Sequence, residues 1–320
     1  MDTIAPERHL KYRHLIERAQ HLTPVPTAVA HPCDETSLQA AFQAAGLGLI
    51  APVLVGPAAK IRAIAKQYKL DIDKLPIVDA AHSHAAAAAA VQLVRDGKAE
   101  ALMKGSLHTD ELMGAVVAHD TGIRTERRIS QCFIMDVPTR SDPLIISDAA
   151  VNITPTFEDK VHIVQNAIDL AHALGFPEVL VAILSAMETI NPKLMTTIEA
   201  AALSKMADRG QITGALVDGP LALDNAISAD AAAIKHIVSP VAGRANVLIA
   251  PDLEAGNMLA KSLTFLADAD AAGIVLGARV PVILTSRADS VLTRLASCAV
   301  AAMLADARRR NIANAAGSGT

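Results

Sequence analysis

Residues 100–109 read EALMKGSLHT, an apolar run followed by a lysine and a polar loop that contains a glycine. An apolar run of this length, Glu100–Lys104, is typical of a strand covered on both faces. Ser106 or Thr109 then supplies the kind of side chain that is preferred at the start of a helix. We interpret this stretch as a β–α unit, in which the strand delivers Lys104 to a loop that opens the next helix.

The same unit recurs along the 320-residue chain. Strand-length apolar runs lie at 27–30, 50–55, 76–79, 100–104, 131–136, 144–147, 178–184, 214–218, 246–250, 273–276 and 281–285. Helical periodicity lies between most of them, at 6–20, 35–45, 58–68, 85–95, 158–174, 192–209, 229–236, 253–267 and 288–307. This alternation predicts an α/β protein with a largely parallel sheet and helices on both faces.

One pair of strands breaks the alternation. Gln131–Asp136 and Leu144–Ser147 are separated only by a short polar loop around 138–143. Strands joined this closely are expected to be antiparallel neighbours, because a parallel crossover needs a dozen or more residues. The length of the chain predicts about two domains. We place the first domain boundary in this loop, near Pro138.

The composition excludes several classes of protein. Lys plus Arg total 29 and Asp plus Glu total 33, a net charge of −4, which lacks the basic surplus of a nucleic-acid binder. No apolar stretch is long enough for a membrane span, and the charged residues of Met1–Lys11 do not form a signal peptide. The three cysteines, at positions 33, 132 and 298, are odd in number and far apart, which predicts a reducing, cytoplasmic location.

Polar side chains follow several of the expected strands. Ligands of open α/β sheets bind beyond the carboxyl ends of the strands, so these loops are the expected binding face. Backbone N–H groups at the helix start after Lys104 favour an anion. Helix capping or bracing of the loop remains an alternative for each loop taken singly. The candidate substrate-binding residues are Lys104, Ser106, His108, Asn152, Thr154, Asp218, Asp224, Asn225 and Asn257.

The loop 285–290, TSRADS, opens the last long helix. Arg287 in the first turn is unfavourable for the helix dipole unless an anion compensates it. A guanidinium fork is also the side chain best suited to a phosphate group. This loop predicts anion binding, with helix capping beside a solvated arginine as the alternative. The residues alone therefore indicate a two-domain α/β enzyme that binds an anionic, phosphorylated small molecule.

Six longer motifs resemble the phosphate acetyl/butyryltransferase family. They are MKGSLHT at 103–109, ISDAAVNITPT at 146–156, AMETINPK at 186–193, DGPLALDNAIS at 218–228, PDLEAGNMLAK at 251–261 and LTSRADS at 284–290. The resemblance runs from about Glu100 to Leu304. It implies the reaction acyl-CoA + phosphate ⇌ acyl phosphate + CoA, with CoA as a substrate, no other cofactor and no metal.

The resemblance also implies an architecture. The fold would be that of isocitrate and isopropylmalate dehydrogenases, with two α/β domains, an active-site cleft between them and assembly into a homodimer. The first domain would comprise residues 1–138 and 279–320, and the second residues 139–278. The boundary near Pro138 agrees with this division.

The resemblance assigns catalytic roles to the loop before the last helix. Ser286 matches the family serine that hydrogen-bonds the reacting centre, and Arg287 matches the arginine beside it. The CoA thiolate attacks the acyl phosphate directly, in a ternary complex. Acetyl-type members carry a catalytic aspartate seven residues after the serine, where this chain has Thr293, so Asp289 is the candidate substitute.

A second departure concerns a family arginine. The helix after the glycine loop often carries one, but residues 112–115 here are LMGA, and Arg124, Arg127 or Arg128 would have to supply the charge. The acyl group, acetyl or butyryl, stays open. One alternative is a non-catalytic acetyl-CoA-sensing module of the same fold. Another is a dehydrogenase of this fold, whose metal-binding carboxylates would be Asp218, Asp252 and Glu254.

Overall fold

The computed structural model describes residues 9–285 and 289–317. The chain divides into two compact units, which we call the middle unit (Met1–Lys11 and Arg128–Ala271) and the N/C unit (Tyr12–Arg127 and Ala272–Thr320). The division of the chain expected from the sequence put residues 130–136 with the N-terminal part. These residues belong to the middle unit because they form a strand that pairs antiparallel with Leu144–Ser147.

The sheet of the N/C unit has the strand order β3-β2-β1-β4-β11-β10. Its strands are β1 (Val25–Ala30), β2 (Ile50–Gly56), β3 (Ile77–Asp79), β4 (Ala101–Lys104), β10 (Asp270–Leu276, which begins at the end of the middle unit) and β11 (Val282–Ile283). Neighbours from β3 to β11 pair in parallel, and β10 pairs antiparallel with β11. The carboxyl ends of β1 and β4 therefore lie side by side.

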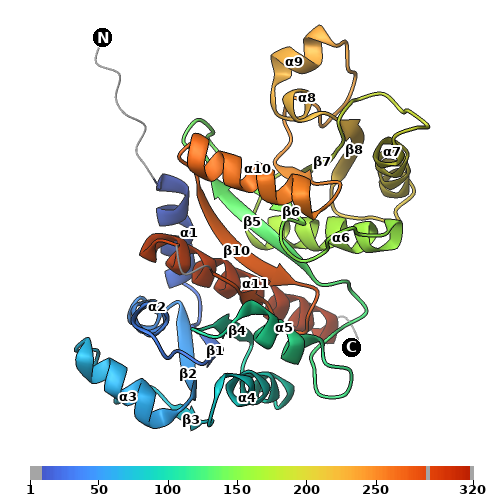
Figure 1. Cartoon of the computed structure of the whole chain (residues 1–320). Coiled ribbons are helices and arrows are strands. Elements are labelled where there is room, and N and C mark those ends of the chain that lie inside the picture. Colours follow the sequence, from blue (N-terminus) through green and yellow to red (C-terminus); the bar gives the residue numbers. More distant parts are fainter. Residues whose placement is uncertain (1–8, 286–288, 318–320) are drawn as a thin grey trace, which may run out of the picture. The chain divides into compact units, whose positions relative to one another are not determined.

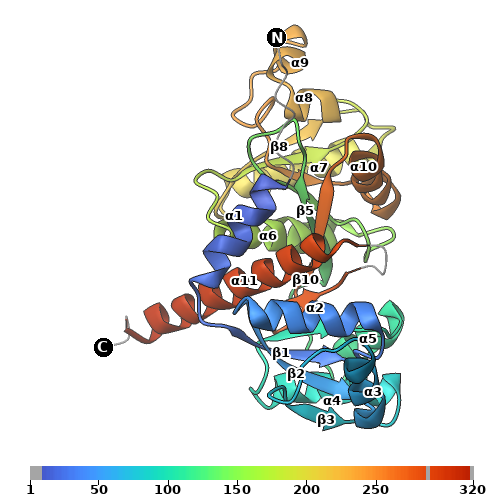
Figure 2. The ribbon, with the colours of Figure 1, turned by 90° about the vertical axis from the view of Figure 1, so that its left-hand side faces the viewer.

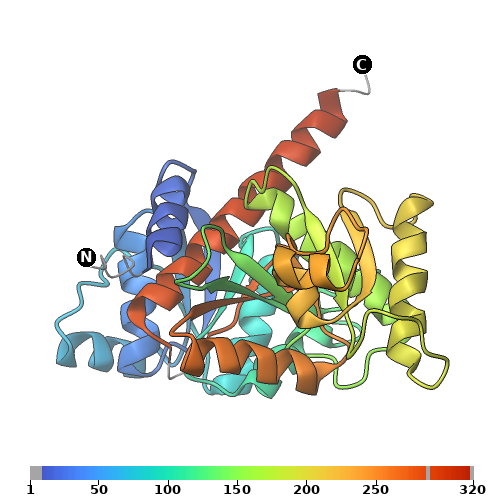
Figure 3. The same ribbon diagram turned by 90° about the horizontal axis from the view of Figure 1, so that it is seen from above.

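Helices cover both faces of this sheet. They are α1 (Leu10–Gln20), α2 (Glu35–Gly46), α3 (Ala58–Gln67), α4 (Ser83–Arg95), α5 (Thr109–Val117) and α11 (Val291–Gly317). Figure 1 shows α2 and α3 on one side of β1–β3 and α4 on the other, as right-handed crossovers in this strand order require. In Figure 2, α2 runs alongside β1 and β2, and Figure 3 shows α11 as one long helix.

The middle unit carries a second set of strands in the order β5-β6-β9-β7-β8. Its elements are β5 (Ser130–Asp136), β6 (Leu144–Ser147), α6 (Phe157–Ala173), β7 (Leu180–Leu184), α7 (Met195–Asp208), β8 (Leu216–Leu221), α8 (Leu223–Ile227), α9 (Ala229–Ile234), β9 (Val247–Ile249) and α10 (Leu253–Leu266). The antiparallel pairing of β5 with β6 confirms the prediction, and the other neighbours are parallel.

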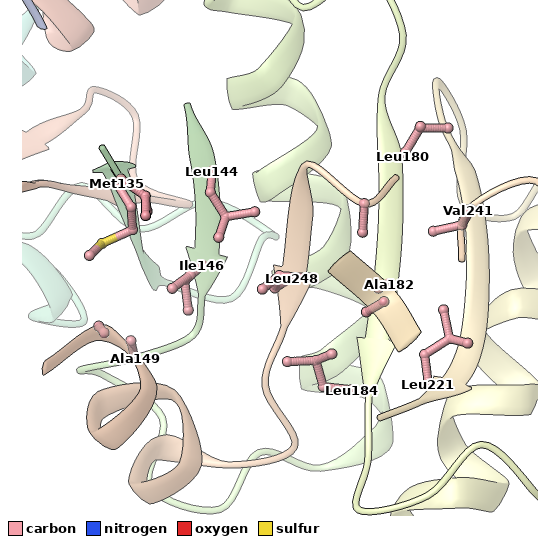
Figure 4. Close-up of a cluster of buried hydrophobic side chains, with 14 of the residues drawn as sticks. Met135, Leu144, Ile146, Ala149, Leu180, Ala182, Leu184, Leu221, Val241 and Leu248 are labelled. Atoms are coloured by element: carbon pink, nitrogen blue, oxygen red, sulfur yellow. The ribbon is translucent and has the colours of Figure 1, made fainter. Parts of the chain in front are cut away.

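A core of aliphatic side chains holds the middle unit together. Leu144, Ile146, Leu248 and Ala182 project from neighbouring strands into one cluster, which Figure 4 shows together with Met135 and Ala149. Burying a side chain of the size of leucine stabilises a fold by about 1.5–3 kcal/mol. The predicted α/β class is confirmed in both units. No helix within the described ranges is long and apolar enough to cross a lipid bilayer.

Candidate active site

The loop after β4 is pressed against the end of β1. Lys104 pairs in register with Ala30, and the Gly105 amide donates to the Ala30 carbonyl at 2.9 Å. A Cβ atom on Gly105 would lie 2.3 Å from the Ala30 oxygen and 2.5 Å from the His31 oxygen. Only glycine fits this approach of two backbones, so the glycine of the motif serves the packing of the loop on β1.

A small pocket, open to solvent, lies beside this loop. Its lining residues are Asp34, Thr36, Ser37, Ala40, Met103, Lys104, Gly105, Thr285 and Arg294. The side chains of Lys104 and Arg294 bring two positive charges to the pocket, and Arg294 is almost fully buried there. The first turn of α2 adds the positive end of a helix dipole. The pocket is therefore suited to an anionic group.

Asp34 also lines the pocket, but its carboxylate caps α2. Its Oδ1 accepts from the Ser37 amide at 2.8 Å and from the Ser37 hydroxyl at 2.6 Å. This capping explains why α2 begins at Glu35, since an aspartate at this position satisfies an amide that the helix leaves unpaired.

Ser106, a predicted binding residue, is held by the segment that follows β1. Its hydroxyl donates to the His31 carbonyl at 2.9 Å and lies 3.0 Å from Nδ1 of the His31 ring. The Cys33 amide donates to the same hydroxyl at 3.3 Å. Burial, followed by the charge of Lys60, lowers the pKa of the His31 ring below its ordinary value of 6.5. The Ser106 hydroxyl therefore ties the glycine loop to a histidine that is neutral at pH 7.

His108, the third predicted residue of this loop, begins α5. Its amide donates to Oε2 of Glu111 at 2.8 Å, while its side chain is exposed. Ser83 donates to Oε1 of the same carboxylate at 2.6 Å. These hydrogen bonds lower the pKa of Glu111, the bond from Ser83 more than that from His108. Helix capping, the alternative stated for this loop, accounts for the backbone contact of His108.

The predicted catalytic residues Ser286 and Arg287 lie outside the described residues. Asp289 is described and partly exposed. Thr293 is buried, and its hydroxyl accepts from the Ser290 hydroxyl at 3.0 Å while its amide donates to the same oxygen at 3.1 Å. Ser290 therefore caps the start of α11. The position of the family aspartate is occupied by a hydroxyl group that cannot act as a carboxylate base.

The loop after β6 is braced internally. The buried Asp148 carboxylate accepts from the amides of Gln131 (3.1 Å), Ala150 (3.1 Å), Val151 (3.2 Å) and Asn152 (2.9 Å). The Asn152 side-chain amide donates to Asp148 and to the Ile129 carbonyl, and its oxygen accepts from Arg128 Nε at 2.7 Å. Asn152 thus holds the loop, which is the alternative stated for this motif. Arg128, one of the three candidate arginines, is engaged in the same network.

The start of α10 packs against the same loop. The Asn257 amide donates to the Ala149 carbonyl at 3.1 Å, and a Cβ atom on Gly256 would lie 2.4 Å from the Asp148 carbonyl. Thr154, two residues beyond Asn152, is exposed. The structure therefore brings Asn152 and Asn257 together at the ends of β6 and β9, with Thr154 on the surface of the same loop.

A third group lies beyond β7 and β8. Lys235 Nζ contacts Glu188 at 3.1 Å and Asp224 at 3.3 Å, and Asn225 donates to Glu188 at 3.1 Å. The hydrogen bond from Lys235 lowers the pKa of Glu188, while the Asn225 amide, followed by Lys235, lowers that of Asp224. Asp218 lies apart from this ion pair and accepts from the Gly219 amide at 2.8 Å. Asp224 therefore belongs to a partly exposed charge cluster, and the buried Asn225 donates to its Glu188.

The candidate residues taken from the sequence did not include His31, Asp34, Arg294 and Glu188. The signal for the first two was the string HPCDE, which directly follows an expected strand as the other motifs do. Within the described ranges, no three His, Cys, Asp or Glu side chains are grouped so that they could hold a metal ion. The trio Asp218, Asp252 and Glu254, considered for a dehydrogenase, forms no such group.

Comparisons with known proteins agree with the motif set. The family model described as phosphate acetyl/butaryl transferase matches residues 82–302. A phosphate acetyltransferase of Rhizobium meliloti is 64% identical over 95% of this chain and 96% of its own length. A phosphate butyryltransferase of Clostridium beijerinckii is 39% identical over 92% of this chain and 97% of its own.

Among solved structures, a phosphotransacetylase from Streptococcus pyogenes superposes with a TM-score of 0.80 at 22% identity, over 92% of this chain and 98% of its own. This likeness supports the fold, while the matched residues and the identities above support the relationship. The chain belongs to the phosphate acetyl/butyryl transferase family.

Proposed function

We propose that this protein transfers an acyl group between coenzyme A and inorganic phosphate. The observation that carries the proposal is the pocket beside β4, where Lys104, Arg294 and the first turn of α2 surround a volume suited to a phosphoryl group. The family relationship supplies the reaction class. CoA takes part as a substrate. Acyl-CoA and phosphate on one side balance acyl phosphate and CoA on the other, without a further reactant.

The proposed chemistry is direct attack within a ternary complex. The CoA thiolate adds to the carbonyl carbon of the acyl phosphate, the bond from carbon to the phosphate oxygen breaks, and thioester and phosphate leave. Ser286 hydrogen-bonds the reacting carbonyl, Arg287 pairs with the phosphoryl group, and Asp289 is the candidate substitute for the family aspartate. Donors placed where negative charge develops are worth about 10²–10³ in kcat.

We propose acetyl as the preferred acyl group. The phosphate acetyltransferase of Rhizobium meliloti is 64% identical to this chain, against 39% for the phosphate butyryltransferase of Clostridium beijerinckii. Acyl pockets discriminate by only about 1–3 kcal/mol per methylene, so activity with propionyl-CoA would fall before it disappears.

We also propose a cytoplasmic homodimer. The three cysteines are free and buried, which fits a reducing compartment. Met258 and Phe265, seven residues apart on α10, are 62% and 81% exposed, and an apolar stripe of this kind fits a subunit contact. A mass of 33.3 kDa for the particle in light scattering, the mass of one chain, would contradict the dimer.

The first test measures phosphate-dependent release of free thiol from acetyl-, propionyl- and butyryl-CoA. We expect the rate of release to be highest with acetyl-CoA, lower with propionyl-CoA and lowest with butyryl-CoA. Ser286→Ala should lower kcat, and Arg287→Gln should raise KM for phosphate. Lys104→Ala should raise KM for phosphate about tenfold, the loss of about 1.4 kcal/mol expected for one charge-assisted hydrogen bond. The exposed Lys98→Ala is its matched control and should keep the wild-type KM.

Two results would contradict the proposal. The first is no thiol release with any of the three thioesters. The second is wild-type kinetics in both Ser286→Ala and Arg287→Gln, which would place the reaction elsewhere on the chain.

A further inference from the structure

Attack by CoA requires a group that takes the proton from its thiol. The thiolate is the nucleophile, and a free thiol with a pKa of about 8.5 is only a few per cent ionised at pH 7. Thr293, which stands at the position of the family aspartate, has a hydroxyl that cannot accept this proton at neutral pH. We propose that Nε2 of His31, in place of Asp289, is the proton acceptor for the CoA thiol, an inference that rests on the proposed function.

The hydrogen bonds of Ser106 are compatible with a His31 tautomer that carries its proton on Nδ1. A serine hydroxyl has one proton, and that of Ser106 is donated to the His31 carbonyl at 2.9 Å. With the hydroxyl proton assigned in this way, the contact of 3.0 Å between Nδ1 and the same hydroxyl is an Nδ1–H donor bond. A neutral imidazole with its proton on Nδ1 carries a lone pair on Nε2. In this tautomer the ring can accept a proton at Nε2.

The backbone holds this ring at the end of β1. His31 has φ +55°, in the left-handed region that few residues other than glycine adopt. Its amide donates to the Val55 carbonyl at 2.7 Å, and its carbonyl accepts from the amides of Ser106 and Cys33 at 2.9 and 2.8 Å. Its side chain is partly exposed, one residue beyond the position that pairs with Lys104. The histidine thus contacts Ser106, which directly follows the pocket residues Lys104 and Gly105, and its side chain is partly accessible.

The charges around the ring keep it ready to accept a proton. Burial and Lys60 on α3 favour the neutral form, while Glu111 on α5 and Asp34 at the start of α2 favour the protonated form. Burial and Lys60 have the larger effect, so the pKa of His31 lies below 6.5 and the ring is neutral at pH 7. The two carboxylates would stabilise the imidazolium that forms during the reaction. A base of this kind is typical of acid–base catalysis near neutral pH.

The step balances without any further reactant. The thiol proton moves to Nε2 as sulfur bonds to the carbonyl carbon. The bond from carbon to the phosphate oxygen then breaks, and the imidazolium returns the proton to the departing phosphate. In the reverse direction the same ring takes a proton from phosphate and gives it to the departing thiolate.

The left-handed backbone conformation at His31 allows substitutions that remove the imidazole without straining the backbone. Glycine and asparagine both tolerate φ +55°, so His31→Gly and His31→Asn remove the base without straining the chain. His236 offers a matched control because it has φ +54° and an exposed side chain. His236→Gly makes the same change in the same backbone conformation outside the proposed site. We expect both His31 variants to keep the wild-type melting temperature within a few degrees.

The test follows thioester formation from acetyl phosphate and CoA as a function of pH. For the wild type, kcat/KM for CoA should rise with pH to a plateau with a midpoint below 6.5. Both His31 variants should lose about 10²-fold in kcat at pH 7, keep the KM for acetyl phosphate, and show a rate that rises towards the pKa of the free thiol, about 8.5. Added imidazole should restore part of the activity of His31→Gly. It should leave the activity of the control His236→Gly unchanged.

A wild-type pH profile in both His31 variants would overturn the role of His31 while leaving the proposed reaction intact. His31→Gly could also lose the expected activity but show no rescue by imidazole and an unchanged pH profile. That result would make the histidine a packing residue and would also overturn the proposal. A wild type that forms no thioester at any pH would instead refute the reaction itself.

Discussion

The loops after β4 and after β6 look alike in sequence, but their polar side chains have different roles in the structure. Both place polar residues directly after a buried strand, KGSLHT in one and SDAAVN in the other. After β6, the Asp148 carboxylate and the Asn152 side chain form hydrogen bonds within the loop and with residues 128–131 of the same unit. After β4, the lysine lines a pocket together with Arg294 and the start of α2.

The difference teaches how a polar motif is divided between structure and chemistry. A buried carboxylate must be compensated, and Asp148 is compensated by amides that lie within its own unit. The Lys104 side chain instead lines an open pocket, where a substrate can reach it. The predictions that follow test whether the two loops differ in this way, beginning with the largest expected effect.

Replacing the carboxylate of the braced loop should cost the most. We expect Asp148→Ala to lower the free energy of unfolding by about 3 kcal/mol, because several buried amides lose a charged acceptor at once. Denaturant unfolding of the purified variant measures this loss. Asp230→Ala, at an exposed position, should stay within about 0.5 kcal/mol of the wild type. Equal stability of the two variants would show that the loop does not depend on its internal network.

Adding one methyl group to the other loop should damage the site. A Cβ on Gly105 would meet two backbone oxygens, at 2.3 and 2.5 Å, so the loop after β4 must move away from β1. We expect Gly105→Ala to lose about 1–3 kcal/mol of stability and most of its thiol-release activity. Gly114→Ala, in α5, is the matched control because nothing lies within 4 Å of its new Cβ, and it should gain up to about 1 kcal/mol. Full activity in Gly105→Ala would place the site away from this loop.

The smallest effect is expected in the exposed cluster around Lys235. The folded-state pKa of Glu188 lies below its ordinary value of 4.5, so its contribution to stability is present above pH 4.5 and is lost as the pH falls through the folded value. Glu188→Gln should therefore lower the melting temperature slightly at pH 7, and the difference should vanish in acid. Melting curves at several pH values measure it. A difference that grows towards acid pH would contradict the assigned charge state.

Local patterns predicted the elements well, because strands and helices are decided by nearby residues. The expected strand 144–147 coincides with β6, and the expected helix 253–267 ends one residue beyond α10. The short helix α8 (Leu223–Ile227) was missed, because five residues show too little periodicity for a helix to be predicted. The five-residue run 281–285 became the two-residue strand β11.

The site was harder to predict because its decisive contacts span the chain. Ser106 lies 75 residues from His31, and they meet only because β4 pairs with β1. Nothing in the loop itself shows that its serine hydroxyl is already engaged. The role of Asn152 was equally hidden, because its bond to Arg128 depends on how the loop after β6 folds back on residues before β5. Motif spacing therefore located the loops, and the sheet register assigned their side chains.

Each unit contains a buried cysteine whose labelling can report how often that unit opens. Cys132 lies in β5 of the middle unit and Cys298 in α11 of the N/C unit, and burial raises the pKa of both thiols to about 12. A thiol in that environment reacts with an alkylating reagent only when the surrounding structure opens. The labelling rates of the two positions, resolved by mass spectrometry of peptides, would thus measure how often each unit opens on its own. Equal rates would mean that the two units unfold together.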